Sequence, residues 1–292
     1  MTSNQPLWSG LSAQEHEFQY NPQAAFPNYA EAQVGRQAAN AEARATLACR
    51  ADLAYGEHPL HRVDVYPAAA GAAGAAPVHI FFHGGYWRAQ DKQNFAFVAR
   101  RLVEAGITTV VANYELCPAS TLDGVATSAI AAVDWVRREA SGFGGDPGRI
   151  SLSGHSAGAH LTAEAMAHDW AARGVDPSFI VGAVLISGIY DPRPVMATTV
   201  NAQVQLTEEI ALRRDVERRP VFAKCPATVF VGGLEPWQWI DQSYRYAHHL
   251  HRSGMNPEVH TLPRWGHFDI LNEYIEPGTP ILSAVVKRAK QA

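Results

Sequence analysis

The chain has little of what marks several classes of protein. Its 292 residues include only three cysteines, widely spaced, and 24 lysines and arginines against 28 aspartates and glutamates. So few cysteines exclude a disulfide-built scaffold and predict free thiols in a reducing cytoplasm. A formal charge of -4 excludes the basic footprint of a nucleic-acid-binding protein. We therefore expect a cytoplasmic protein without a nucleic-acid partner.

Long apolar runs are also missing. No stretch approaches the ~18 consecutive apolar residues that span a bilayer, and the first ten residues have neither the basic nor the apolar region of a secretory signal. We therefore expect no membrane partner and no signal peptide. With 47% hydrophobic and 18% charged residues, the chain has a globular composition and can bury a large core. The expected partner is a small-molecule substrate, and a homodimer is left open.

Strand-like and helix-like segments alternate along the chain. Apolar patterning predicts strands at 60–66, 78–82, 107–112, from 150, at 181–186, 228–231 and 258–262. Between them it predicts helices at 91–105, 121–140, from the turn after 155 to 172, at 240–252 and from 280. This alternation is typical of the α/β class, with a mostly parallel central sheet and helices on both faces.

The remaining segments divide the chain around one domain. Residues 1–50, with a helix over 29–49, are expected to be an N-terminal extension anchored on the core by its aromatic side chains. Residues 51–292 should form a single domain, in which the Ala- and Gly-rich segment 67–77 is a surface loop. The arginine-rich stretch 190–220 is either a solvated helix face or a small cap inserted over the active site.

The stretch from 150 to 161 contains the residue pattern that points most directly to a catalytic site. An apolar strand leads into Gly154-His155-Ser156-Ala157-Gly158, and a helix follows. Small residues two before and two after Ser156 are what a sharp strand-to-helix turn requires, because larger side chains would collide with neighbouring backbone. G-x-S-x-G is a weak pattern alone, but its place between a strand and a helix supports the interpretation. We predict that Ser156 is a nucleophile.

A nucleophilic serine needs a base, and the base needs an acid that fixes its tautomer. On such an elbow the acid and then the histidine follow the serine in the chain, each after a strand. Glu235 follows the strand at 228–231, and His267 follows the strand that ends near 262. We therefore predict Glu235 as the acid and His267 as the base. Asp241 and Asp191 remain alternatives for the acid.

Acyl transfer also requires hydrogen-bond donors for the oxyanion. The buried strand at 78–82 runs into His83-Gly84-Gly85, and two adjacent glycines allow backbone N–H groups to turn toward the serine. We predict an oxyanion hole at Gly84, Gly85 and Ala157. Several aromatic residues fall on loops at the same end of the sheet and could form a slot for an aryl leaving group: Tyr86, Trp87, Tyr190, Trp237, Trp239 and Phe268.

Five stretches resemble the arylformamidase (kynurenine formamidase)-like members of the α/β-hydrolase superfamily. The most specific is His83-Gly84-Gly85-Tyr86-Trp87, which matches their HGGxW signature. The others are 154–161, 187–191, 231–235 and 266–268, so the resemblance covers roughly residues 50–275. It implies the α/β-hydrolase fold and the roles already given to Ser156, Glu235, His267 and the oxyanion residues. The signature is much less specific for the substrate than for the hydrolase group.

Four functions follow from this sequence. The first is a serine hydrolase that cleaves an aryl formamide resembling N-formylkynurenine through an acyl-enzyme on Ser156, and the second is a carboxylesterase or aryl-amidase for small acyl groups. The third is a non-catalytic binding protein of the same fold. The fourth, a metal-dependent formamidase, lacks a convincing ligand set, since His248 and His251 have no third ligand in the pattern. We therefore expect no metal and no cofactor.

Overall fold

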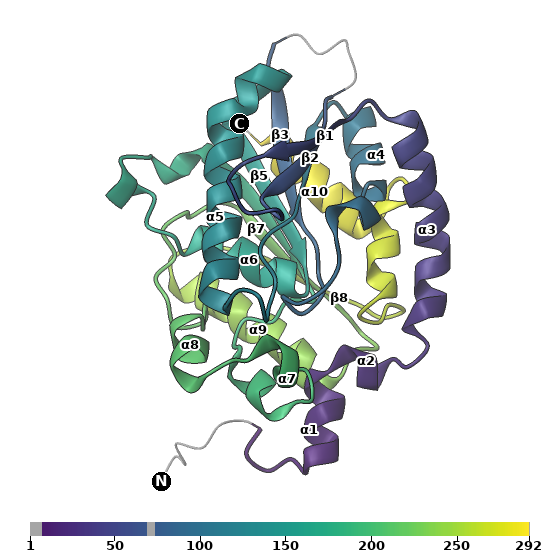
Figure 1. The fold of residues 1–292 in the computed structure, drawn as a ribbon, viewed down its shortest axis with the longest axis vertical. Helices are drawn as coiled ribbons and strands as arrows, with labels where there is room; N and C mark the ends of the chain where they lie inside the picture. Colours follow the sequence, from purple (N-terminus) through teal and green to yellow (C-terminus); the bar gives the residue numbers. More distant parts are fainter. Residues whose placement is uncertain (1–7, 69–73, 292) are drawn as a thin grey trace.

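The computed structural model describes residues 8–68 and 74–291, with a twisted eight-stranded sheet at its centre (Figure 1). The strands are β1 (Arg50–Ala54), β2 (Arg62–Tyr66), β3 (Ala76–Phe82), β4 (Thr108–Ala112), β5 (Gly145–His155), β6 (Ile180–Ile186), β7 (Ala227–Gly232) and β8 (Glu258–Leu262). They lie in the order β1-β2-β4-β3-β5-β6-β7-β8. β1 and β2 run antiparallel to their neighbours, and the other neighbouring strands are parallel. The predicted α/β class with a mostly parallel sheet is confirmed.

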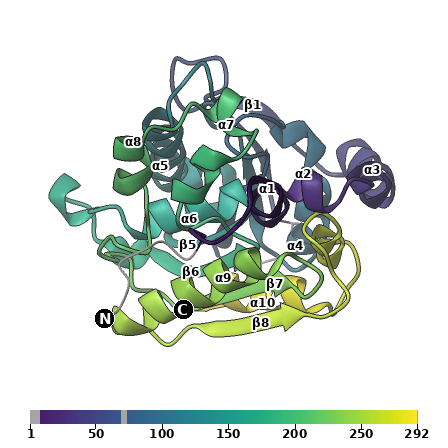
Figure 2. The same ribbon diagram turned by 90° about the horizontal axis from the view of Figure 1, so that it is seen from below.

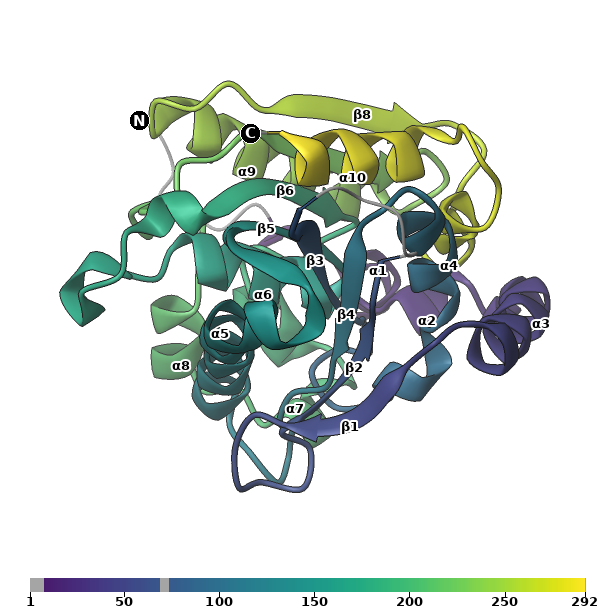
Figure 3. The same cartoon turned by 90° about the horizontal axis from the view of Figure 1, so that it is seen from above.

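Helices cover both faces of this sheet. The helices are α1 (Ala13–Tyr20), α2 (Pro22–Ala25), α3 (Tyr29–Thr46), α4 (Phe97–Glu104), α5 (Leu122–Glu139), α6 (Ala157–Met166), α7 (Asn201–Val204), α8 (Glu208–Arg213), α9 (Trp237–Arg252) and α10 (Pro280–Lys290). Helices α4 and α10 pack on one face, and α5, α6 and α9 pack on the other (Figure 3). Within the described residues, none of the helices is both long and apolar enough to cross a membrane.

The continuous apolar run of β3 is explained by burial on both faces. Val78, Ile80 and Phe82 belong to the core under α5, α6 and α9, whereas Phe81 belongs to the core under α4 and α10. Side chains alternate between the faces of a strand, so a strand covered on both sides must be apolar throughout. The carboxyl ends of β3, β5, β7 and β8 meet along one edge of the sheet, where the site lies.

Some local predictions differ from the structure. The helix predicted over 91–105 begins only at Phe97, after the short turn η1 (Lys92–Asn94). The Lys92 side chain is buried and pairs with Asp52 at 2.6 Å and Asp64 at 2.7 Å, which ties this segment to the edge of the sheet. Strand β1 was not predicted because its residues are mostly exposed and do not alternate. Part of the loop predicted over 67–77 lies outside the described residues.

The N-terminal segment packs on the outside of the α/β core (Figures 1 and 2). Helix α1 contacts α9, and α3 contacts α4. The Tyr20 hydroxyl, which is buried, donates a hydrogen bond to Oε1 of Gln238 at 2.8 Å, and His16 Nε2 donates to the carbonyl oxygen of Pro194 at 2.7 Å. These contacts anchor α1 at the end of the sheet where the site lies.

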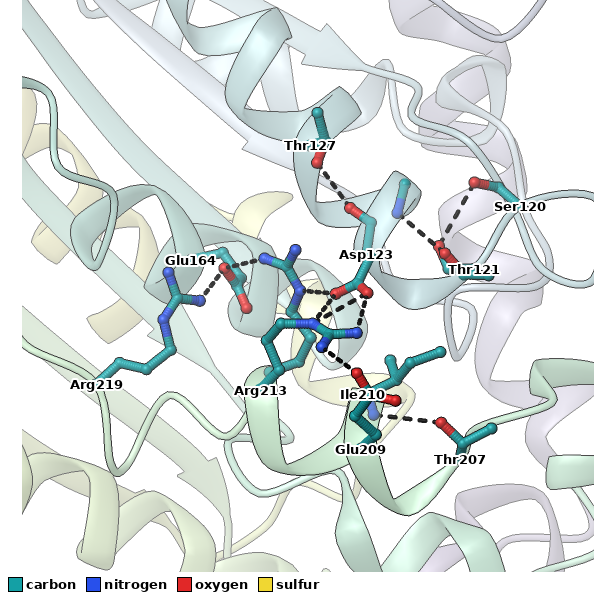
Figure 4. A network of polar contacts seen from close by, with 12 residues as sticks. Ser120, Thr121, Asp123, Thr127, Glu164, Thr207, Glu209, Ile210, Arg213 and Arg219 are labelled. Atoms are coloured by element: carbon teal, nitrogen blue, oxygen red, sulfur yellow. Dashed lines mark hydrogen bonds and ion pairs between the residues drawn. The ribbon is translucent and has the colours of Figure 1, made fainter. Parts of the chain in front are cut away.

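The arginine-rich stretch 190–220 forms η5 (Arg193–Ala197), α7 and α8, and its arginines bind acidic side chains of the core (Figure 4). Arg214 lies 3.2 Å from Oε2 of the fully buried Glu164, and Arg219 contacts the same oxygen. Arg213 pairs with Asp123 at the start of α5 at 2.6 Å. These ion pairs hold the stretch against α5 and α6, while the side chains of Arg213 and Arg218 stay about half-exposed to solvent.

Candidate active site

Ser156 occupies a strained turn between β5 and α6. Its backbone has φ 57° and ψ -119°, a left-handed conformation that a non-glycine residue rarely adopts. A Cβ at Gly154 would lie 2.0 Å from the carbonyl oxygen of Gly158, and one at Gly158 would lie 2.0 Å from that of Phe82. Gly154 and Gly158 must therefore be glycine, because α6 starts in direct contact with the ends of β3 and β5. This is the sharp turn that the sequence predicted.

A chain of hydrogen bonds joins Ser156, His267 and Glu235. His267 Nε2 lies 3.0 Å from the Ser156 hydroxyl, and His267 Nδ1 lies 2.7 Å from Oε2 of Glu235. All three residues are buried. An ionised carboxylate can only accept, so Nδ1 of the neutral imidazole carries the proton and Nε2 is left to accept from the serine. The arrangement can therefore activate the serine hydroxyl as a nucleophile.

Additional contacts determine which carboxylate reaches His267. Oε1 of Glu235 accepts hydrogen bonds from the Ser187 hydroxyl at 2.5 Å and from the Gly232 amide at 2.7 Å. Asp241 instead pairs with Arg245 at 2.7 Å, and Asp191 pairs with the arginine two residues after it. The structure thus brings Glu235, and neither alternative, to the histidine.

Two buried side chains hold the histidine loop: His155, which the sequence analysis did not select as a site residue, and Trp239, which it placed in the aromatic slot. His155 Nε2 donates to the carbonyl oxygen of His267 at 2.7 Å, and burial lowers the pKa of His155 well below its ordinary value, which keeps the ring neutral. The indole of Trp239 lies edge-on to the His267 ring, 4.7 Å between centroids, and donates to the Ser187 carbonyl at 2.7 Å. The sequence signal for His155 was its place beside the nucleophile.

The predicted oxyanion loop lies directly against the serine. A Cβ at Gly84 would lie 3.2 Å from Cβ of Ser156, and Gly85 has φ +123°, a conformation that favours glycine. His83 Nδ1 donates to the Gly84 carbonyl at 2.7 Å, which fixes the loop. Among the described residues, no acceptor is hydrogen-bonded to the N–H groups of Gly84, Gly85 or Ala157. Free N–H groups beside a nucleophile can stabilise an oxyanion.

The aromatic slot predicted beside the serine is largely wrong. Tyr86 and Phe268 do line the cavity that contains Ser156. Trp87 and Tyr190 are fully buried, Trp87 against His160 and Tyr190 stacked at 4.1 Å on a tyrosine of α9. Trp237 is 55% exposed and does not line the cavity. Trp87 and Tyr190 therefore pack in the core and Trp237 faces solvent. The sequence could not distinguish these outcomes, because it showed only that each residue follows a strand.

Helix α3 supplies the wall that the sequence analysis missed. The cavity has a volume of about 350 Å³, within the range of small-molecule sites. Tyr29, Gln33, Arg36 and Asn40 line it, at spacings of four, three and four residues, which place them on one face of the helix. Phe268 packs against Tyr29 with ring centroids 5.2 Å apart. The sequence signal for this wall was the row of polar residues on α3 that recur every three or four positions. No residue of 190–220 is among the described lining residues.

One group of metal-ligating side chain types lies away from this cavity. His58, His61 and Glu115 bring candidate ligand atoms within 4.8 Å of one another. Protein groups already bind them, since His61 Nε2 lies 2.9 Å from Glu115 and the Leu60 amide donates to Nδ1 of His58. We assign no metal to this group.

Comparison with known proteins gives consistent matches along the chain. A family model described as the α/β hydrolase fold matches residues 79–269. A kynurenine formamidase of Danio rerio is 31% identical over 96% of this chain and 97% of its own length. Among solved structures, a proposed thioesterase from a Silicibacter species superposes with a TM-score of 0.80 at 24% identity, covering 92% of this chain and 98% of that one. An esterase from Pyrobaculum calidifontis gives 0.70 at 20% identity, covering 92% of each.

Proposed function

This chain belongs to the kynurenine-formamidase-like members of the α/β-hydrolase family, and from that premise we propose that it is a serine hydrolase of N-formyl aryl amides such as N-formylkynurenine. The observation that carries the proposal is the hydrogen-bonded chain from Glu235 through His267 to Ser156, beside free N–H groups at Gly84, Gly85 and Ala157. The hydrolysed bond would be the amide between the formyl carbon and the aryl nitrogen.

The first half of the reaction forms a formyl-enzyme. Ser156 Oγ attacks the formyl carbon while His267 Nε2 takes its proton, and the Glu235 carboxylate stabilises the imidazolium that results. The oxyanion that develops on the carbonyl oxygen is stabilised by the oxyanion loop and by the Ala157 N–H at the positive end of α6. His267 then gives its proton to the aryl nitrogen, the C–N bond breaks, and the arylamine leaves.

The second half returns the free enzyme. His267 removes a proton from a water molecule, whose oxygen attacks the formyl carbon of the ester on Ser156. Collapse of the tetrahedral intermediate breaks the bond to Oγ, and the proton returns to the serine as formate leaves. No redox step or external cofactor is needed to balance this sequence.

The shape of the site favours a small acyl group and a large leaving group. The buried Trp239 indole fills the space next to the His267 ring, and the open volume lies on the α3 side of that ring, lined by Tyr29 and Phe268. A substrate whose bulk is the arylamine, with only a hydrogen on the carbonyl carbon, suits this arrangement. The second candidate is a carboxylesterase or aryl-amidase for small acyl groups, which the same triad favours equally.

A hydrolysis panel distinguishes these candidates. N-formylkynurenine and formanilide would be compared with acetanilide and p-nitrophenyl acetate on the wild type and on Ser156→Ala. We expect formamide turnover that is lost in Ser156→Ala, since removing a triad member of a serine hydrolase can cost about 10⁶-fold in kcat. Fast ester cleavage with negligible formamide cleavage would favour the esterase, and an inactive wild type would favour a binding protein. Activity that persists in a metal chelator would argue against a metal-dependent formamidase.

We also propose a cytoplasmic location. The proposal is supported by Cys49, Cys117 and Cys225, all of which are free thiols in the structure. Fractionation of cells that express the tagged protein tests it, and recovery outside the cytoplasmic fraction would contradict it.

A further inference from the structure

The wall of the cavity on α3 contains a buried arginine, Arg36, that forms no ion pair with another residue in the described part of the chain. Arg36 is 8% exposed and lines the cavity that contains Ser156. Its guanidinium donates one hydrogen bond, from Nη1 to the carbonyl oxygen of Phe268. Among the described residues no carboxylate lies within ion-pair distance of it, and Asp269 attracts it electrostatically only over a longer distance. A guanidinium has five N–H donors, so most of its capacity is free.

A buried cation of this kind is costly unless something compensates it. Burial lowers the pKa of Arg36 to about 10, which still leaves the side chain charged at neutral pH. Buried charges in proteins are normally paired, because taking an unpaired ion out of water costs several kcal/mol. The Phe268 carbonyl oxygen accepts a hydrogen bond from Arg36, but it is uncharged and does not neutralise the guanidinium. An anion entering the cavity would supply the missing partner.

The other charged group on the cavity wall has the same sign. Arg88 lines the cavity and donates hydrogen bonds to the side-chain oxygens of Gln203 and Gln23, which are neutral. No aspartate or glutamate is among the described lining residues. In a chain with a net charge of -4, this cavity is therefore locally positive. Clefts lined by one sign of charge attract ligands of the opposite sign.

We propose that Arg36 binds a carboxylate carried by the leaving-group part of the substrate, assisted by Arg88. This rests on the proposed function, and it assigns to Arg36 the recognition of the carboxylate that a substrate such as N-formylkynurenine carries. A guanidinium fits a carboxylate through two parallel N–H···O bonds. The Phe268 carbonyl holds the arginine in place next to the loop of His267, so the carboxylate and the scissile amide would be positioned together.

The test compares two substrates that differ only in this charge. These are 3-(2-formamidobenzoyl)propanoate and the corresponding propanamide. We expect the wild type to prefer the carboxylate by about 10- to 100-fold in kcat/KM, mainly through KM, which is the size of a charge-assisted hydrogen bond. Arg36→Gln should lose at least tenfold more activity on the carboxylate than on the amide. Arg36→Lys should keep part of the preference, since it keeps the charge but not the two parallel bonds.

The matched control is Arg138→Gln, an exposed arginine of α5 that pairs with Asp134 away from the cavity. It should show the wild-type preference. Arg88→Gln is the second test and should reduce the preference by several-fold. Equal losses on both substrates in Arg36→Gln, without recovery in Arg36→Lys, would overturn the proposal and leave Arg36 only a positioning role for the Phe268 loop. A wild type that turns over both substrates equally well would also overturn it.

Failure of the proposed function can be told apart from failure of this inference. If the enzyme hydrolyses p-nitrophenyl acetate but neither formamide, the formamidase function fails and the arginine is tested by inhibition of the ester reaction. 3-Benzoylpropanoate should then inhibit at least tenfold more strongly than 3-benzoylpropanamide in the wild type, and Arg36→Gln should abolish the difference. Equal inhibition by both compounds in the wild type would overturn the anion site.

Discussion

Glu235→Gln tests the proposed triad because the structure fixes the direction in which the new amide would turn. One carboxylate oxygen of Glu235 accepts from the Ser187 hydroxyl at 2.5 Å and the Gly232 amide at 2.7 Å, and the other accepts from His267 at 2.7 Å. Glutamine offers one accepting oxygen and one donating NH₂ group. Two donors on one side require the oxygen there, so the NH₂ group must face Nδ1 of His267.

The consequence is an inverted imidazole. Nδ1 of His267 would accept from the NH₂ group, and the ring proton would move to Nε2, which faces Ser156. A protonated Nε2 cannot take the serine proton. In a serine protease triad the equivalent change of tautomer costs about 10⁴ in kcat, which corresponds to about 5 kcal/mol of transition-state stabilisation. The side chains have nearly the same shape, so we expect little change in Tm.

The assay is kcat on p-nitrophenyl acetate, which does not depend on the natural substrate, with Tm measured in parallel. Asp241→Asn is the control, since Asp241 pairs with Arg245 on α9 and should be dispensable for turnover. A Glu235→Gln enzyme within tenfold of the wild type, with an unchanged Tm, would refute the role of Glu235. A large loss in Asp241→Asn instead would identify that residue as the acid.

Three further predictions concern stability. Gly158→Ala places a Cβ 2.0 Å from a carbonyl oxygen of β3, so urea denaturation should show a loss of about 3 kcal/mol or more in unfolding free energy. Arg219→Met removes an ion-pair partner from the fully buried Glu164 carboxylate, with an expected loss of about 3 kcal/mol by the same measurement. Burial raises the pKa of Asp215 from 3.8 to about 6 in the folded state, so the contribution of this group to stability falls as the pH rises from 4 to 6. Asp215→Asn removes that titration, and its stability relative to the wild type should increase by about 2 kcal/mol over this interval.

The first two of these predictions have matched controls in the structure. Gly142→Ala adds a Cβ with no atom within 4 Å and should be nearly neutral. Arg213→Met removes a half-exposed ion pair from the same network (Figure 4) and should cost less than about 1 kcal/mol. Losses of equal size in the paired variants would contradict the burial argument. A stability difference between Asp215→Asn and the wild type that is constant from pH 4 to pH 7 would contradict the third prediction.

The parts of the site that the sequence predicted are those governed by local geometry. Gly154 and Gly158 must be glycine because α6 begins in contact with the strands, and this constraint involves only the five consecutive residues 154–158, so it can be recognised in the sequence. The positions of Glu235 and His267 followed from chain order, since each comes directly after a strand of the parallel sheet. The aromatic slot failed because burial depends on what packs from elsewhere. Trp87 and Phe268 both follow sheet strands, yet only Phe268 faces the cavity.

Hydrophobic periodicity and turn chemistry act between residues close in the chain, so the α/β architecture, the nucleophile elbow and the order of the triad could be predicted from the sequence. The sequence left Asp241 and Asp191 open beside Glu235, and the tertiary structure excluded both, since Ser187 and the Gly232 amide, brought together from β6 and β7, hold Glu235 against His267. It also decided that α3, more than 100 residues before Ser156 in the chain, forms a wall of the cavity and places Arg36 there, where no carboxylate of residues 8–68 or 74–291 pairs with it. Such contacts arise from docking one element on another, and no local pattern encodes them.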